Sequence, residues 1–329
     1  MKIVIDATVP FVAERIPTDV DTVVKPSADI TAADVADADA LVVSTRMRTG
    51  SPLLEGSRVK VVATGSIGMD HIDSEWCRSH GIEAVNAPGC NAPAVVQYVV
   101  CSLHAAGFDF SRQTLGVVGK GNIGSLLTRV VRDAGGRVVV CDPPRAEAGF
   151  DDEEYLSLNR LLQEADAVTF HVPKKIDGPH PTYHLLSADI TGLMRPHTIV
   201  VNASRGGVIC EKAFLSLPNP LIIDTWEGEP SLDISIMERA LIATPHIAGY
   251  SEQGKQRAAR SVIEALNRVL KLEISADGLA DYSFRQNPPS LERMLASYNP
   301  GVDSRILKAD PSNFETIRNS YRYRPEAQI

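Results

Sequence analysis

Residues 114–124 read TLGVVGKGNIG, the most informative segment of the chain for its architecture. It opens with the short apolar run of a buried β-strand, and the LLTRVVRDAGG that follows at 126–136 has helical spacing. Between them, Gly119 allows a tight turn, Gly121 lets backbone N–H groups approach a pyrophosphate, and Gly124 lets helix and strand pack closely. Glycines alone also mark ordinary turns, but here they predict a strand–turn–helix unit that binds a dinucleotide.

The next strand strengthens this interpretation. Residues 137–141 read RVVVC, and Asp142 follows them. A carboxylate at that point binds the ribose hydroxyls of the adenosine half of NAD, and it would repel the 2′-phosphate of NADP. We therefore expect NAD as the cofactor. The residues of this unit that we expect to contact it are Gly119, Gly121, Asn122, Ile123, Gly124 and Asp142.

The composition narrows the choice of partner. The chain has 329 residues, 44% hydrophobic and 22% charged, which is typical of a globular protein with about two domains. Its net charge of −8 argues against nucleic acid or an anionic membrane as the main partner, although a local cluster of arginines could bind a small anion. The five cysteines are scattered without metal-ligand spacing, so we expect reduced thiols and no metal site. The N-terminal residues do not resemble a signal peptide and no apolar run reaches membrane length, which predicts a cytoplasmic protein.

Strands alternate with helices along most of the chain, which predicts an α/β protein with parallel sheets covered on both faces. In the first part, strands are expected near 2–6, 20–25, 40–44, 60–64 and 83–86, and helices near 31–38 and 74–80. A long apolar helix at 93–106 then leads into the glycine turn. Six strands are expected between Thr114 and Thr244, the number in a complete doubly wound dinucleotide domain. An amphipathic helix at 252–272 is expected to return to the first domain.

Three polar stretches follow strands of the second domain, at the strand ends where such sheets hold ligands. They read NASRGG at 202–207, DTWEGEP at 224–230 and TPHIAGY at 244–250. With the glycine turn, they resemble the D-isomer-specific 2-hydroxyacid dehydrogenase family over roughly residues 1–275. The resemblance implies a doubly wound parallel-sheet (Rossmann) NAD domain at 93–252, a smaller flavodoxin-like α/β substrate domain at 1–92 and 253–275, and a short C-terminal appendage at 276–329.

The chemistry of such an enzyme requires a base that removes the hydroxyl proton while hydride leaves the same carbon. His246 suits this role because imidazole titrates near working pH and because it follows a strand. The other seven histidines are expected in the core, on the surface or in loops. By the resemblance, Glu229 holds the His246 ring, with Glu227 as the alternative. Arg205 is expected to bind the substrate carboxylate through its two-pronged guanidinium.

The resemblance also implies the remaining contacts. Thr45, Ser66 and Tyr250 are expected to contact substrate, and Arg46 to add charge for a phosphate; Arg48 is equally compatible with a solvated loop. Asp224 is expected to contact the nicotinamide carboxamide. Beyond the glycine turn, the cofactor contacts implied are Val172, Ala203, Ser204, Arg205, Asp224 and Gly249.

Finer features favour one branch of the family. APGCNA at 87–92, CDPPR at 141–145 and HIAGY at 246–250 resemble the members that oxidise 4-phospho-D-erythronate to 2-oxo-3-hydroxy-4-phosphobutanoate in pyridoxine 5′-phosphate biosynthesis. The alternative is a dehydrogenase for another D-2-hydroxy acid, such as glycerate or 3-phosphoglycerate. A further alternative is a non-catalytic, NAD-sensing corepressor, which the presence of Arg205, Glu229 and His246 disfavours.

The appendage predicts a homodimer. Residues 276–329 are too few to bury a core of their own, yet Phe314, Ile317 and Tyr321 share one face of a predicted helix. A second subunit about a two-fold axis could cover that face; alternatively the helix folds back on its own chain. Three arginines lie beside this face and in a dimer could reach the neighbouring active site: Arg318, Arg322 and Arg324.

Overall fold

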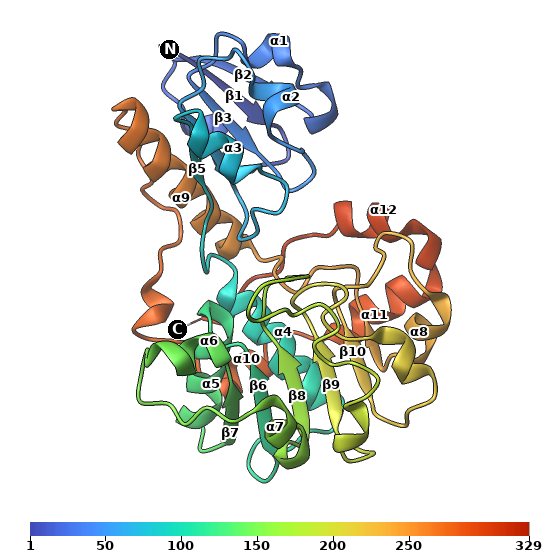
Figure 1. Ribbon diagram of the computed structural model, residues 1–329. Helices are drawn as coiled ribbons and strands as arrows, with labels where there is room; N and C mark the ends of the chain where they lie inside the picture. The colour runs from blue at the N-terminus through green and yellow to red at the C-terminus, as the bar shows by residue number, and fades with distance from the viewer. Residues whose placement is uncertain (329) are drawn as a thin grey trace. The chain divides into compact units, whose positions relative to one another are not determined.

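A computed structural model describes residues 1–328, which form two compact units. Unit 1 comprises Met1–Asn91 and Ser251–Ser283, and unit 2 comprises Ala92–Tyr250 and the residues from Phe284 on. Both are α/β structures with a parallel sheet (Figure 1). Within residues 1–328, no helix has both the length and the apolar character needed to cross a membrane.

Unit 1 is built on a five-stranded sheet whose order is β2-β1-β3-β4-β5, the order of flavodoxin-like folds. The inner strands are continuous apolar runs that are buried on both faces, as parallel strands usually are. This confirms the predicted smaller flavodoxin-like domain. The strands are β1 (Lys2–Asp6), β2 (Asp21–Lys25), β3 (Ala40–Val43), β4 (Val61–Thr64) and β5 (Glu83–Val85).

Helix α9 (Glu252–Leu270) belongs to unit 1. Its Val262, Ile263 and Leu266 join Ile3 and Ile5 of β1 in one core cluster. The side chain of Ser251 caps the helix by accepting the N–H of Gly254 at 3.0 Å. The shorter helices of this unit are α1 (Ala32–Val35), α2 (Ser51–Leu54) and α3 (Ser74–Ser79), with 3₁₀ turns at Ala13–Arg15 and Ser27–Asp29.

Unit 2 contains the six-stranded sheet that the sequence predicted, in the order β11-β10-β9-β8-β6-β7. All its pairings are parallel, and the strand order reverses between β6 and β8, which is where doubly wound sheets bind dinucleotides. The predicted Rossmann architecture is therefore confirmed. In the commonest form of this sheet two strands lie beyond the first one, whereas here only β7 lies beyond β6. The strands are β6 (Thr114–Val118), β7 (Arg137–Cys141), β8 (Ala167–Phe170), β9 (Ile199–Asn202), β10 (Leu221–Ile223) and β11 (Ile242–Ala243).

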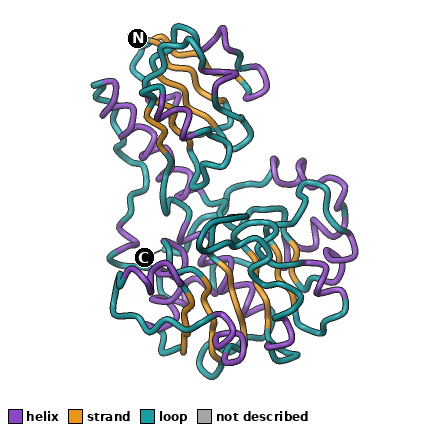
Figure 2. Tube along the Cα trace, in the orientation of Figure 1, coloured by secondary structure: helices purple, strands orange, loops and turns teal. Residues whose placement is uncertain are grey.

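Helices surround the strands of unit 2 (Figure 2). The longest, α4 (Ala92–Ala105), is buried along almost its whole length. Helix α5 (Asn122–Asp133) follows the glycine turn, as predicted. The others are α6 (Pro143–Ala148), α7 (Leu158–Glu164), α8 (Ile234–Arg239), α10 (Leu291–Leu295), α11 (Pro300–Ala309) and α12 (Phe314–Asn319), with 3₁₀ turns at Thr191–Leu193, Glu211–Leu215, Ser283–Arg285 and Pro311–Asn313.

The C-terminal segment differs from the separate appendage expected at 276–329. From Phe284 on it belongs to unit 2, where Leu307 and Phe314 are buried in the same core cluster as strands β8 to β11, and Ile317 packs against that cluster. Ser304 of α11 accepts the N–H of Ala243 at 3.0 Å, so α11 covers the β11 edge of the sheet. The apolar face that motivated the homodimer prediction is thus covered by its own chain, because its residues complete the core of unit 2.

Candidate active site

The glycine turn after β6 has the geometry that a pyrophosphate requires. Gly119 has a φ of +91°, and a Cβ added there would lie 2.6 Å from the carbonyl oxygen of His171. A Cβ at Gly124 would lie 2.0 Å from the carbonyl oxygen of Gly119, so neither position accepts a side chain. A Cβ at Gly121 would meet nothing within 4 Å, so this glycine borders open space. Helix α5 starts at Asn122 without a side-chain cap, which leaves its first N–H groups able to bind an anion.

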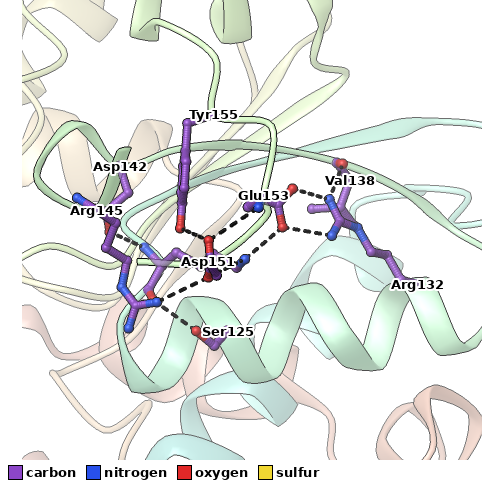
Figure 3. A network of polar contacts seen from close by, with 9 residues as sticks. Ser125, Arg132, Val138, Asp142, Arg145, Asp151, Glu153 and Tyr155 are labelled. Atoms are coloured by element: carbon purple, nitrogen blue, oxygen red, sulfur yellow. Dashed lines mark hydrogen bonds and ion pairs between the residues drawn. The ribbon is translucent and has the colours of Figure 1, made fainter. Parts of the chain in front are cut away.

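Asp142 is fixed beside this turn (Figure 3). Its carboxylate accepts the N–H of Lys120 at 2.7 Å, and it caps α6 by accepting the N–H of Arg145 at 3.2 Å. The Lys120 ammonium pairs with Glu153 at 2.7 Å and with Asp151 at 3.0 Å, and Asp151 lies 3.5 Å from Arg145. The end of β7 and the glycine turn are therefore joined through one charged network, which the sequence did not reveal.

Val172 lies on the other side of the turn, after β8. Its Cγ1 would be 2.8 Å from a Cβ on Gly119, so its side chain contacts the glycine loop directly. The neighbouring His171 ring is buried, and burial lowers its pKa to about 3, so it is neutral. The structure thus places the predicted cofactor residue Val172 at the strand-order reversal.

The loop after β9 carries Arg205. The side chain of Asn202 shapes this loop by donating to the carbonyl oxygens of Arg205 at 3.0 Å and Thr225 at 3.2 Å. Its Oδ1 accepts the N–H of Ser204 at 3.2 Å, and Arg205 Nη1 donates to the Ser204 carbonyl at 2.8 Å. A Cβ at Gly206 would lie 1.8 Å from a carbonyl oxygen of the loop after β10. The two loops are therefore packed backbone to backbone, with Arg205 at their junction.

Asp224 supports the loop that carries His246. Its carboxylate is buried and accepts the Thr244 hydroxyl at 2.7 Å and the N–H groups of Ile247 at 2.8 Å and Ala248 at 3.0 Å. Its carbonyl accepts the N–H of His246 at 2.8 Å. Burial raises the pKa of Asp224, against the effect of these donors and of His246. The structure shows Asp224 as a support of this loop, and its contact with nicotinamide stays a prediction.

His246 and Glu229 form a close pair. Nδ1 of His246 lies 2.6 Å from Oε1 of Glu229, and the two side chains are 27% and 25% exposed. Burial would raise the pKa of Glu229, but the hydrogen bond and charge of His246 outweigh it and the net pKa is lowered. Glu229 is therefore ionised and accepts a hydrogen bond from the N–H at Nδ1 of His246. This leaves Nε2 as the ring nitrogen that can take up a proton from substrate. His246 has a φ of 58°, a left-handed conformation that its surroundings impose.

Glu227, the alternative partner, points elsewhere. Its carboxylate binds the Tyr183 hydroxyl and Nε2 of His184, each at 2.9 Å. Its N–H donates to Oε1 of Glu211 at 2.6 Å. Glu211 is buried, and burial raises its pKa to about 8. The structure therefore brings Glu229, the expected partner, to His246.

Arg324 holds the far side of the same loop. Its guanidinium is buried and donates to the carbonyl oxygens of Ile247 at 2.9 Å, Tyr250 at 3.2 Å and Ala94 at 2.9 Å. Its Nε donates to the side chain of Gln97 at 3.2 Å. The loop 246–250, including the predicted contacts Gly249 and Tyr250, is thus fixed by Asp224 on one side and by the C-terminal segment on the other. No local sequence signal marks Arg324 for this role.

The predicted substrate residues of unit 1 follow neighbouring strands. Thr45 and Arg46 are exposed after β3, and Ser66 is partly buried after β4, which pairs with β3 in parallel. The Ser66 hydroxyl lies 2.9 Å from that of Thr64 and 3.0 Å from the carbonyl oxygen of Gly68, to which it donates. The carboxyl ends of these two strands therefore lie together, as the sequence indicated, and the substrate role of the three residues stays a prediction.

Comparison with known proteins places the chain in a family. Residues 99–248 match the model "D-isomer specific 2-hydroxyacid dehydrogenase, NAD binding domain". Erythronate-4-phosphate dehydrogenase of Bacteroides thetaiotaomicron is 39% identical, over 99% of this chain and 97% of that protein. The chain belongs to the erythronate-4-phosphate dehydrogenase family. The relative of the same name in Escherichia coli O7:K1 is 36% identical, over 99% of this chain and 92% of its own length.

Membership in the erythronate-4-phosphate dehydrogenase family makes the chain an NAD-dependent dehydrogenase, which confirms the predicted enzyme class and cofactor.

The fold is also found in solved structures of more distant dehydrogenases. The structure of D-lactate dehydrogenase from Aquifex aeolicus, complexed with NAD and lactic acid, superposes with a TM-score of 0.65 at 21% identity, covering 82% of this chain and 96% of that one. The glycine turn, the open space beside Gly121 and the fixed Asp142 fit the binding of NAD in this family.

Proposed function

We propose that the chain oxidises 4-phospho-D-erythronate at C2 to 2-oxo-3-hydroxy-4-phosphobutanoate, in the biosynthesis of pyridoxine 5′-phosphate. The observation that carries the proposal is the pair of His246 and Glu229, 2.6 Å apart, in the same unit as the NAD-binding turn. The oxidation of a secondary alcohol requires a group that removes the hydroxyl proton, and a histidine held by a carboxylate suits this role. The names of the relatives supply the substrate.

In this proposal Nε2 of His246 removes the proton of the C2 hydroxyl. NAD, when bound, accepts the hydride from the same carbon. The Glu229 carboxylate keeps the Nδ1 proton in place and stabilises the imidazolium that forms, as a carboxylate partner does for a general base. Arg205 binds the substrate carboxylate through its guanidinium fork, which fixes C2 relative to the base. Asp224 and Arg324 hold the His246 loop in position.

The same proposal assigns the cofactor contacts. The first N–H groups of α5 would bind the pyrophosphate of NAD, which the lack of a side-chain cap at Gly121 supports. Asp142 binds the adenosine ribose. The full proposed set is Gly119, Gly121, Asn122, Ile123, Gly124, Asp142, Val172, Ala203, Ser204, Arg205, Asp224 and Gly249. On the substrate side we propose Thr45, Arg46, Ser66 and Tyr250.

A substrate panel tests the function. 2-Hydroxy acids with and without a terminal phosphate are assayed with NAD by absorbance at 340 nm, and the His246→Ala variant serves as the blank for enzyme-dependent turnover. We expect 4-phospho-D-erythronate to give the highest kcat/KM. A higher value for glycerate or 3-phosphoglycerate would assign the chain to another member of the wider family. Absence of turnover with every acid, while NAD still binds, would favour the NAD-sensing corepressor.

We further infer a homodimer in the cytoplasm. The support for association is the outer face of α11, where Val302 and Ile306 are 45% and 48% exposed one turn apart. Apolar side chains on one helix face favour a partner surface. Sedimentation equilibrium at micromolar concentration tests this inference, and a monomer there would contradict it.

A further inference from the structure

The C-terminal segment brings a cation to the active-site loop of its own chain. Arg318 lies in α12, and its side chain is 17% exposed. Its Nε donates to the hydroxyl of Tyr250 at 3.2 Å, and the guanidinium lies 6.0 Å from the centre of the Tyr250 ring. Tyr250 ends the loop that carries His246. The cation therefore lies at the end of the loop that holds the catalytic base.

The charge of Arg318 acts on the catalytic pair. Burial would lower its pKa, but the fields of Tyr250 and Glu229, the Tyr250 hydrogen bond and the field of Glu315 outweigh burial and raise it. In return, Arg318 is among the groups that lower the pKa of Glu229, after the contacts of His246. The Arg318 guanidinium therefore lies close enough to the Glu229–His246 pair for its charge to stabilise the ionised Glu229.

The ion pair within α12 does not account for this placement. Nη1 of Arg318 lies 3.5 Å from a carboxylate oxygen of Glu315, whose side chain is 44% exposed. A pair with such an exposed acid, three residues away on one helix, is screened and worth little. A largely buried guanidinium carries a desolvation cost that a strong anionic ligand would offset. An anion bound at this position would therefore interact more strongly with the guanidinium than an anion bound to an exposed arginine.

The other tail arginines do not have these properties. Arg324 is committed to the carbonyl oxygens of its loop, as described above. Arg322 is exposed. Arg318, in contrast, is largely buried and donates to the Tyr250 hydroxyl rather than to backbone carbonyl oxygens.

We propose that Arg318 binds the terminal phosphate of the substrate within the active site of its own chain. The inference rests on the proposed function, because a phosphorylated 2-hydroxy acid has two anionic ends and Arg205 is assigned to the carboxylate. A planar guanidinium fork matches phosphate oxygens bidentately, which a point charge does not. The Tyr250 hydroxyl orients this fork through Nε. Arg318 thereby selects phosphorylated acids over their unphosphorylated counterparts.

The test compares 4-phospho-D-erythronate with D-erythronate in Arg318→Met, Arg318→Lys and the exposed control Arg322→Met. We expect Arg318→Met to raise the KM for the phosphorylated acid by roughly 10- to 100-fold, the usual effect of losing a charged hydrogen bond. The KM for D-erythronate should rise much less, because this acid has no phosphate for Arg318 to bind, whereas any effect of the lost charge on His246 and Glu229 should change kcat for both acids alike. Arg318→Lys should give an intermediate KM, and Arg322→Met should change neither substrate.

Inorganic phosphate provides a second arm, measured as inhibition of the turnover of whichever 2-hydroxy acid is active. It should compete with substrate in the wild-type protein and lose most of this effect in Arg318→Met. Equal losses for both acids, or unchanged phosphate inhibition in Arg318→Met, would overturn the proposal. A wild-type protein with no preference for the phosphorylated acid would refute the proposed function, and the phosphate arm would still decide the role of Arg318. NAD binding by fluorescence verifies that each variant is folded.

Discussion

His246 and Glu229 come from loops that follow different strands, β11 and β10, yet Nδ1 of the histidine lies 2.6 Å from Oε1 of the glutamate. The backbone of the histidine loop is fixed by Asp224, whose carbonyl accepts the His246 N–H at 2.8 Å. The pair is therefore set by the parallel pairing of the two strands.

Replacing His246 by Ala should lower kcat by about 10²- to 10⁴-fold, because a positioned general base is worth that much. NAD affinity should persist, since the glycine turn is unchanged. Glu229→Gln should cost less, because the amide keeps a hydrogen bond to Nδ1 and loses only the charge. Steady-state kinetics and NAD titration measure both effects. His197→Ala, at a side chain that is 64% exposed, is the control, and a loss below tenfold for His246→Ala would contradict the assignment.

Arg205→Lys should not behave as a conservative change. Lysine retains the charge but loses the planar fork that binds a carboxylate through two hydrogen bonds. We expect a large rise in the KM for the acid with little change in NAD affinity. The measurement is a pair of saturation curves, one for the acid and one for NAD. A KM close to that of the wild type would mean that another group binds the carboxylate.

The choice of NAD over NADP should depend on Asp142, whose carboxylate would face the 2′-phosphate of NADP. Asp142→Ala should lower the ratio of kcat/KM for NAD to kcat/KM for NADP. Lys120 and Arg145 lie next to Asp142, so their side chains could then interact with the 2′-phosphate of NADP. Asp142→Asn separates the charge from the hydrogen bonds that the side chain makes. Equal or better use of NADP by the wild-type protein would refute the prediction.

Glu211 should make stability depend on pH in the direction opposite to that of most carboxylates. Its folded-state pKa, about 8, lies above the ordinary value of 4.5, so between these values the folded state holds a proton that the unfolded state has lost. The protonated Glu211 therefore adds to the free energy of unfolding. This stabilisation is fully present below the ordinary pKa of 4.5 and is lost as the pH rises from there to about 8, by up to about 1.4 kcal/mol per pH unit. Glu211→Gln should remove that slope in urea unfolding between pH 5 and 8, whereas Glu238→Gln, at an exposed position, should not. Parallel slopes in the wild type and Glu211→Gln would contradict it.

Phe314→Ala should destabilise the chain by about 3–5 kcal/mol, the usual cost of emptying a fully buried aromatic site. Leu215→Ala, at a residue that is 50% exposed, is the control and should change stability by less than about 0.5 kcal/mol. Unfolding at two protein concentrations separates a core role from a subunit contact. A loss for Phe314→Ala that appears only at low concentration would indicate an interface.

The sequence predicted both sheets because buried parallel strands consist of short apolar runs, and segments with helical spacing separate them. It also placed the polar stretches after the right strands, since parallel strands end at one edge. The choice of Glu229 over Glu227 came from the family resemblance, because the residues alone do not show which side chain a tight loop turns toward His246. The tail was predicted least well, because no helix was expected at Pro300–Ala309, where α11 begins at the proline with Asn299 as its cap.

The contacts of Arg324 have a consequence for how the protein folds. They join Arg324 to Ile247 and Tyr250 of the His246 loop, 77 and 74 positions earlier in the chain, and to Ala94, 230 positions earlier. Contacts of such sequence separation form late, because the closure entropy of the intervening chain opposes them. Refolding should therefore restore helical circular dichroism before catalytic turnover. Recovery of activity would then report the docking of the last segment rather than the formation of the sheets.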